Sequence, residues 1–201
     1  MCGSVNMMNK IVVLALTATG LAGWPARMIK ASELASAPTQ RLITEQAALP
    51  LNRADFTVII NQHKVALMAF WDSALAEKLG PASHSDYVGS SPEEGGGYKF
   101  YRYQYDSFTL YTSNLDWEKQ RQEIDSYRIA QITLHSPVLR TARGIHIGST
   151  EQAVLQAYGT GVYESYQDIQ RRCYRFQGME LVFTLQHNDV NAITLVWSGR
   201  H

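Results

Sequence analysis

The side chains that could carry out chemistry are few in this chain of 201 residues, and they stand apart from one another. The two cysteines are Cys2 and Cys173. Cys173 falls in a predicted strand, on the side opposite to Tyr174, and no cysteine-protease signature surrounds it. A nucleophilic thiol needs a nearby base, so we expect Cys173 to be a structural or spare thiol. An enzyme of unknown type that uses Cys173 and a histidine is the alternative.

The histidines do not have the spacing of a zinc site. No two histidines are four residues apart, and none is spaced with a cysteine as zinc ligands are. The six histidines are His63, His84, His135, His146, His187 and His201. His135 and His146 flank a predicted junction and could meet in space, but ordinary surface histidines are the stronger expectation. We therefore expect no metal site.

Two further patterns resemble ligand sites only superficially. Four acidic residues surround Trp117, namely Asp116, Glu118, Glu123 and Asp125. Their spacing does not match a calcium loop, so a solvated charged segment is the safer interpretation. The glycines at 144 and 148 are not followed by the Lys-Ser/Thr pair of a phosphate loop. We expect no cofactor.

Aromatic residues carry the strongest binding signal. A strand predicted over residues 98–105 places Tyr101, Tyr103 and Tyr105 on one face, and Tyr111 on the partner strand can share that face. Tyrosine is enriched at protein interfaces because its ring offers a large area with few rotatable bonds. With Trp117, these residues form the predicted protein-binding surface. The alternative is that the tyrosines pack as ordinary cross-strand pairs.

Two short helices would position these residues. Residues 141–159 predict a turn at Gly148, an N-cap at Ser149 with Gln152 completing a capping box, and a C-terminal stop at Gly159. A weaker copy is expected over residues 65–80. There Asp72 or Ser73 would cap the helix, and Gly80 and Pro81 would end it.

Alternating apolar residues predict antiparallel strands after each helix. Met179, Leu181, Phe183 and Leu185 give the clearest such pattern. A strand is also expected at residues 56–60. The three strands after the first helix are expected at 98–105, 108–112 and 127–135, and those after the second at 172–176, 179–185 and 190–197. Residues 81–97 are expected to be an exposed loop, and 163–170 a polar connection.

The predicted fold class is therefore α+β, a tandem repeat of a helix followed by a three-stranded antiparallel sheet. Residues 1–37 form a signal peptide or N-terminal anchor, and 38–60 a linker and leading strand. Residues 61–140 and 141–201 are the two helix-sheet repeats. About 70 residues per repeat is marginal for independent stability, so we expect a shared core or a continuous sheet.

Composition limits the classes of function. The chain is 45% hydrophobic and 18% charged, with a formal net charge of zero. A nucleic-acid-binding protein that neutralises phosphates needs a basic surface, so we expect no nucleic-acid partner.

The N-terminus has the pattern of an export signal. Lys10 is followed by an apolar run over residues 11–23, too short for a standard membrane span. Translation can start at Met7 or Met8, and cleavage can follow Ala37 or fall nearer Gly23. An uncleaved N-terminal anchor is the alternative and the only expected contact with a membrane. No cysteine follows the run as in a lipoprotein. If the segment is removed, Cys173 remains as a single cysteine and no intramolecular disulfide forms.

The second predicted repeat resembles a known superfamily. The motif comprises Thr141, Gly144-Ile-x-Ile-Gly148-Ser, Ala-Val-Leu at 153–155 and Tyr158-Gly159, followed by Tyr-x-Phe, an apolar strand and Ile-Thr-Leu. It resembles secreted bacterial proteins of the β-lactamase-inhibitor-protein-like fold, whose superfamily includes the SmpA/OmlA-type outer-membrane assembly lipoproteins. The resemblance covers about residues 64–197, loosely in the first half, where Met68-Ala69 replaces the usual glycine. It implies tandem helix–sheet repeats in an exported protein that binds proteins through a sheet face, and it carries no catalytic residues.

The expected function is thus that of an exported, non-enzymatic protein that binds another protein or associates with the cell envelope. A structural envelope component is a further alternative. Export would place the protein in the periplasm, the cell envelope or the medium.

Overall fold

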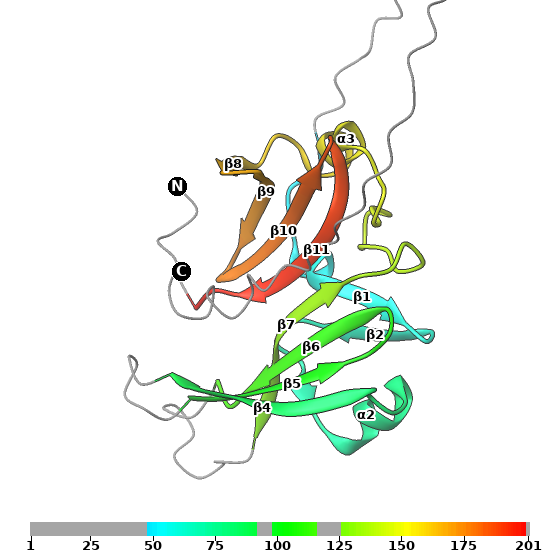
Figure 1. Ribbon diagram of the computed structural model, residues 1–201, viewed down its shortest axis with the longest axis vertical. Coiled ribbons are helices and arrows are strands. Elements are labelled where there is room, and N and C mark those ends of the chain that lie inside the picture. The colour runs from blue at the N-terminus through cyan, green and yellow to red at the C-terminus, as the bar shows by residue number, and fades with distance from the viewer. Residues whose placement is uncertain (1–47, 92–97, 116–125, 200–201) are drawn as a thin grey trace, which may run out of the picture. The chain divides into compact units, whose positions relative to one another are not determined.

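A continuous antiparallel sheet dominates the structure. The computed structural model describes residues 48–91, 98–115 and 126–199. Its nine-stranded sheet runs in the order β4-β5-β6-β7-β11-β10-β9-β8, and a short strand, β3, pairs with β7. The central pairing of β7 with β11 joins strands from the two halves of the chain (Figure 1). A separate hairpin consists of β1 and β2.

The elements follow one another closely along the chain. A 3-10 helix spans Arg53–Phe56, before β1 (Thr57–Ile60) and β2 (His63–Ala66). The first half of the sheet comprises β3 (Phe70–Trp71), β4 (His84–Ser91), β5 (Tyr98–Gln104), β6 (Phe108–Ser113) and β7 (Tyr127–Leu134), with helix α2 at Ser73–Leu79. The second half comprises α3 (Glu151–Tyr158), β8 (Val162–Tyr166), β9 (Ile169–Phe176), β10 (Met179–Gln186) and β11 (Asp189–Trp197).

The apolar residues of the sheet gather on one side, which we call the helix face. Leu110 pairs with Ile132, and Ile132 pairs with Leu195. Directly opposed residues of antiparallel strands point to the same side, so the three side chains form a fully buried row. The β1–β2 hairpin, α2 and α3 all add side chains to this core. In Figure 1, α2 lies at the β4 end of the sheet and α3 at the β8 end.

The strongest strand prediction is confirmed. In β10 the residues alternate between buried and half-buried, and Leu181 and Phe183 are completely buried. Tight turns set this register. Gln177 and Gly178 both have positive φ, as do His187 and Asn188 at the next turn, which is the geometry that matches the twist of a hairpin. The strands predicted from residues 56, 98, 108, 127, 179 and 190 are found within one or two residues of those bounds.

Helix α3 begins one residue later than predicted. Its N-cap is Thr150, whose hydroxyl accepts a hydrogen bond from the backbone N–H of Ala153. The Ser149 hydroxyl instead accepts from the N–H of His146 and holds the preceding turn. Gly148 and Gly159 have positive φ, as expected. The prediction of Ser149 was wrong because Ser149 and Thr150 both fit the sequence pattern of an N-cap. The Ser149 hydroxyl is used instead by the N–H of His146 in the turn before the helix.

Helix α2 is shorter than the segment predicted for it. Residues 65–71 of that segment belong to β2 and β3, and the helix is capped by Asp72 and ends at Gly80. Leu79 is its single buried residue.

The predicted fold class, an α+β tandem repeat of a helix followed by a three-stranded sheet, is wrong. The described residues form a β-rich fold with eleven strands and two α-helices of seven and eight residues. Helices of about two turns bury too little surface to form a layer, so the β1–β2 hairpin fills the middle of the core. Each half of the sheet also holds a further strand, β4 or β8, at its outer edge.

Both edge strands were predicted as irregular chain. Residues 84–91, assigned to an exposed loop, form β4, and the polar connection at 163–170 contains β8 and the start of β9. An edge strand does not need an apolar face of its own, and these sequences accordingly lack the alternation on which the prediction relied.

Other predictions fall outside the described residues. These are the export signal at 1–37, residues 38–47 of the predicted linker and leading strand at 38–60, the glycines at 95–97 and the acidic segment around Trp117. In the part of the chain that is described, no helix is long and apolar enough to cross a membrane.

Candidate functional site

The predicted tyrosine row exists and faces the core side of the sheet. Tyr101, Tyr103 and Tyr105 lie on the helix face, because Tyr103 pairs with the buried Leu110. Tyr105 stacks on Phe108 with the ring centroids 4.3 Å apart, and Tyr103 meets Trp71 at 4.7 Å. Both tyrosines pack against the hydrophobic core. The row therefore begins as interior packing beside α2 and reaches the surface at Tyr101.

Tyr101 lies at the centre of an aromatic cluster on the surface. Its ring is 5.3 Å from that of Tyr87 and 5.4 Å from that of Tyr127. Tyr127 is the strand partner of Trp71, and Trp71 contacts Tyr103, so Trp71 and Tyr103 belong to the same cluster. We call these five residues, Trp71, Tyr87, Tyr101, Tyr103 and Tyr127, the aromatic patch. Tyr87 is 53% exposed and the other four are half-buried.

Short strand β3 holds one side of the patch in place. The backbone N–H of Met68 donates to the Ile129 carbonyl, and the N–H of Ile129 donates back to the Ala69 carbonyl. Arg128 Nη1 also donates to the Met68 carbonyl at 2.9 Å. Backbone hydrogen bonds to β7 therefore fix the position of Trp71. The five rings of the patch all belong to strand residues and not to loop residues.

The other two predicted binding residues are not placed in the patch. The strand register pairs Tyr111 with Arg102, on the face away from the helices. Arg102 makes a two-point ion pair with Asp86 at 2.9 and 2.8 Å, and this hydrogen bonding raises the pKa of Arg102. The register thus contradicts the expected shared face for Tyr111. Trp117 lies outside the described residues.

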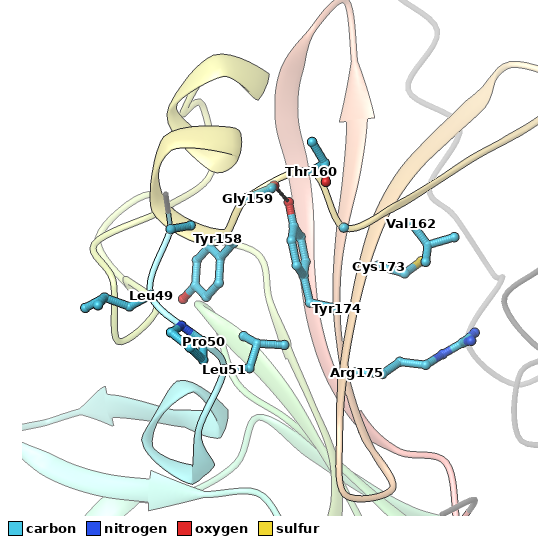
Figure 2. A pocket seen from close by; sticks show the side chains of 12 residues that line it. Leu49, Pro50, Leu51, Tyr158, Gly159, Thr160, Val162, Cys173, Tyr174 and Arg175 are labelled. Carbon is cyan, nitrogen blue, oxygen red and sulfur yellow. Dashed lines mark hydrogen bonds between the residues drawn. The ribbon is translucent and has the colours of Figure 1, made fainter. Parts of the chain in front are cut away.

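Cys173 is 3% exposed and lies at the wall of a pocket of about 390 Å³. Figure 2 shows the cavity between residues 49–51, the end of α3 and the strands β8 and β9. The Tyr174 hydroxyl donates to the Gly159 carbonyl at 2.8 Å across its upper edge. Gly161 fits closely here, because a Cβ on it would lie 2.6 Å from the Tyr174 ring.

The ionisable groups of this pocket are unsuited to activating a thiol. Burial raises the pKa of Tyr174 to about 12, and burial also raises the pKa of Tyr158. Neither phenol is ionised near neutral pH, so neither can act as a general base there. The lining residues include Arg175 but no histidine or carboxylate. The described lining of this pocket therefore supplies no general base that acts near neutral pH.

His135 and His146, which the sequence suggested could meet, are each bonded to another group. His135 shares a 2.7 Å hydrogen bond with the Thr109 hydroxyl, and burial lowers its pKa. His146 bonds through Nδ1 to the Ile147 carbonyl. Across residues 48–91, 98–115 and 126–199, no group of three or more His, Cys, Asp or Glu side chains could hold a metal ion.

An arginine that the sequence did not single out organises the α3 end of the molecule. Arg143 makes a two-point ion pair with Asp55, both N–O distances being 2.7 Å, and Asp55 is 3% exposed. It also donates to the carbonyls of Leu49, Pro50 and Ala157, the last at the end of α3. These partners are up to 94 residues away in sequence, so no local pattern could reveal the network.

The remaining patch residues were missed for a different reason. Tyr87 is in the unpredicted edge strand β4, and Trp71 fell within residues 65–80, which were predicted as a helix. The sequence signal for Tyr127 was present, since it begins a predicted strand, but alternation along one strand does not show which residues meet across strands.

No protein-family model, curated protein or solved structure matches this chain. The resemblance to the β-lactamase-inhibitor-protein-like superfamily therefore stays a prediction.

Proposed function

We propose that this chain is a non-enzymatic protein that binds another protein through the aromatic patch. The observation that carries the proposal is the contiguous contact of Tyr87, Tyr101 and Tyr127, with Tyr87 more than half exposed. Tyrosine and tryptophan dominate the energetics of protein interfaces.

Rigidity supports the same function. The patch residues lie on the four paired strands β3, β4, β5 and β7. Two of the five, Trp71 and Tyr103, also pack against the hydrophobic core. A surface that is already ordered loses little conformational entropy when a partner binds. Large aromatic area on a preformed scaffold is the arrangement expected of a binding site rather than of a catalytic one.

The export signal predicted at residues 1–37 leads us to propose a place of action outside the cytoplasm, in the periplasm, envelope or medium. Cell fractionation tests this part: recovery of the chain in the cytoplasmic fraction, with residues 1–37 retained, would contradict it.

The binding proposal is tested by affinity capture with purified chain as bait against extract of the producing cells. We compare the native chain with the Tyr87→Ser/Tyr101→Ser variant and with a control variant, Val138→Ser, whose side chain is 74% exposed and outside the strands. The proposal expects a protein that the native and Val138→Ser chains retain and the double variant loses. Equal retention by all three chains would show that the patch is not the binding surface.

An enzyme that uses Cys173 and a histidine is the competing function. Alkylation of the folded chain tests it. We expect the native thiol to react far more slowly than the thiol of the unfolded chain, because the side chain is buried. Rapid alkylation of Cys173 itself near neutral pH, located by peptide mapping because the chain also contains Cys2, would favour the enzyme.

A further inference from the structure

The sheet has an open edge at β8 that differs from its other edge. No described strand pairs with the outer side of β8, which is the last strand in the sheet. Val162, Tyr163 and Tyr166 are 38%, 46% and 74% exposed. An edge that presents apolar side chains and unpaired backbone groups is a template for another strand.

The opposite edge strand carries the devices that normally block such pairing. In β4 the register shifts between Tyr87 and Gly89, which makes a bulge, and Gly89 has φ of 135°. Bulges twist an edge away from a straight partner. By contrast, β8 pairs with β9 in five consecutive steps without a shift, and contains neither proline nor lysine. Among the described residues, the edge at β8 therefore has no bulge and no strand paired on its outer side.

The turn after β8 fixes which backbone groups face outwards. Tyr166 pairs with Ile169 across the turn at 167–168. The residues that flank a two-residue turn exchange their hydrogen bonds, and such pairs alternate along an antiparallel ladder. Val162, Glu164 and Tyr166 therefore bond to β9, and Tyr163 and Ser165 direct their N–H and C=O groups to the open side.

Charge decides between a second copy of the chain and a different partner. If two copies paired β8 to β8 over all five residues, Glu164 would lie opposite itself. Directly opposed like charges destabilise a strand pair. On its other side, Glu164 lies opposite Arg171 of β9. An added strand with a basic residue opposite Glu164 would extend this alternation of positive and negative charge across the edge.

A pocket lies beside the start of β8, where Gly161 and Val162 form part of its lining. This is the cavity of about 390 Å³ lined by Leu49, Leu51, Tyr158, Gly161 and Val162. Figure 2 shows Leu51 and Val162 on opposite sides of it. Strand addition gains affinity from the backbone and specificity from such side-chain pockets.

We propose that an extended segment of another protein adds antiparallel to β8. Its basic residue lies opposite Glu164, apolar residues lie opposite Tyr166 and Val162, and a further apolar side chain towards its C-terminus enters the pocket. This site is separate from the aromatic patch, and neither proposal depends on the other.

The test uses the full chain and the fluorescein-labelled peptide Val-Thr-Lys-Thr-Val-Thr-Leu, with fluorescence anisotropy as readout. We expect saturable binding. N-methylation of the first two threonines, which face Tyr163 and Ser165, should weaken it at least about tenfold, because two backbone donors are lost. N-methylation of the lysine and the second valine, whose N–H groups point away, is the matched control and should change affinity much less.

Charge reversal sharpens the result. Replacing the peptide lysine by glutamate should weaken binding to the native chain about fivefold, and the Glu164→Lys variant should reverse that preference. Circular dichroism confirms that the variant is folded. Absence of saturable binding, equal effects of the two N-methylated peptides, or a preference that Glu164→Lys leaves unchanged would each overturn the proposal. Self-association of the native chain that Ser165→Pro abolishes, measured by sedimentation, would assign the edge to a second copy instead, because proline removes an N–H group that faces the open side.

Discussion

The two helices cover the same face of one sheet, yet they are fixed to it very differently. At the α3 end, Val154 and Tyr158 are buried, and Tyr158 contacts the rings of Tyr174 and Phe183. Within α2 only Leu79 is buried. The aromatic rings near this helix extend from the core to the surface, where Tyr87 is exposed. The α3 end uses its aromatic residues for packing, whereas the α2 end leaves Tyr87 exposed, where we propose that a partner binds.

The ends of the two helices show the same contrast. The last turn of α3 is bound by Arg143, a cation at the negative end of the helix dipole that is itself paired with Asp55. At the corresponding end of α2, beyond the backbone cap at Gly80, the Leu79 carbonyl accepts a side-chain hydrogen bond from the neutral amide of Asn61. We infer that stability is concentrated at the α3 end.

The largest expected effect is at Arg143. Arg143→Met leaves the buried Asp55 carboxylate without its partner, and should lower the free energy of unfolding by about 3–5 kcal/mol. Denaturant titration followed by circular dichroism measures it. The double variant Arg143→Met/Asp55→Leu should recover most of the loss, since it removes both charges together. A single variant as stable as the native chain would contradict the assigned role of the network.

The next effect compares one residue on each helix. Val154→Ala removes methyl groups from a fully buried site and should cost about 2 kcal/mol. Leu75→Ala on α2 removes more atoms, but from a side chain that is only partly buried, and should cost less than about 1 kcal/mol. If Leu75→Ala were the more destabilising variant, the contrast between the two ends would be wrong.

The α3 end should also dominate loss of stability in alkali. The pKa of Tyr174 is raised from 10.0 to about 12 in the folded chain. From pH 10 upwards the unfolded state therefore loses the proton first, and stability should fall as the pH rises towards 12. Tyr174→Phe should flatten this fall while lowering stability at neutral pH through the lost hydrogen bond to Gly159. Tyr166→Phe, at an exposed ring, is the control; an unchanged slope in Tyr174→Phe would refute the assignment.

The smallest stability effect is expected in the aromatic patch. Tyr87→Ser changes an exposed edge residue and should alter the free energy of unfolding by no more than about 0.5 kcal/mol. Thermal and denaturant unfolding both measure this. A loss similar to that of Val154→Ala would mean that Tyr87 serves packing, and the comparison between the two ends would lose its functional meaning.

The same contrast shows how far the sequence could predict the structure. Strands with one buried face, such as β10, can be predicted from the alternation of apolar and polar residues. Helix α3 can be predicted from the glycines and hydroxyl residues at its ends. The strands β4 and β8 have no such pattern because they lie at the edges. The class of fold depends on the pairing of β7 with β11 and on the place of the β1–β2 hairpin, and neither contact leaves a local signal.

The candidate site was predictable in part. Tyr101 and Tyr103 were chosen from one strand, whereas Tyr87 and Tyr127 join them only across strands. Tyr111 was misplaced because its face depends on the register of the hairpin at 106–107, which places it opposite Arg102.

Site-specific photocrosslinking most directly tests the claim that the aromatic patch binds a protein. A benzoylphenylalanine replaces Tyr87 in one chain and Val138 in another, and both chains are irradiated in the cells that produce them. We predict a discrete adduct with one protein from position 87, lost when Tyr101→Ser is added, and no such adduct from position 138. The same adduct from both positions, or none from position 87, would contradict the account.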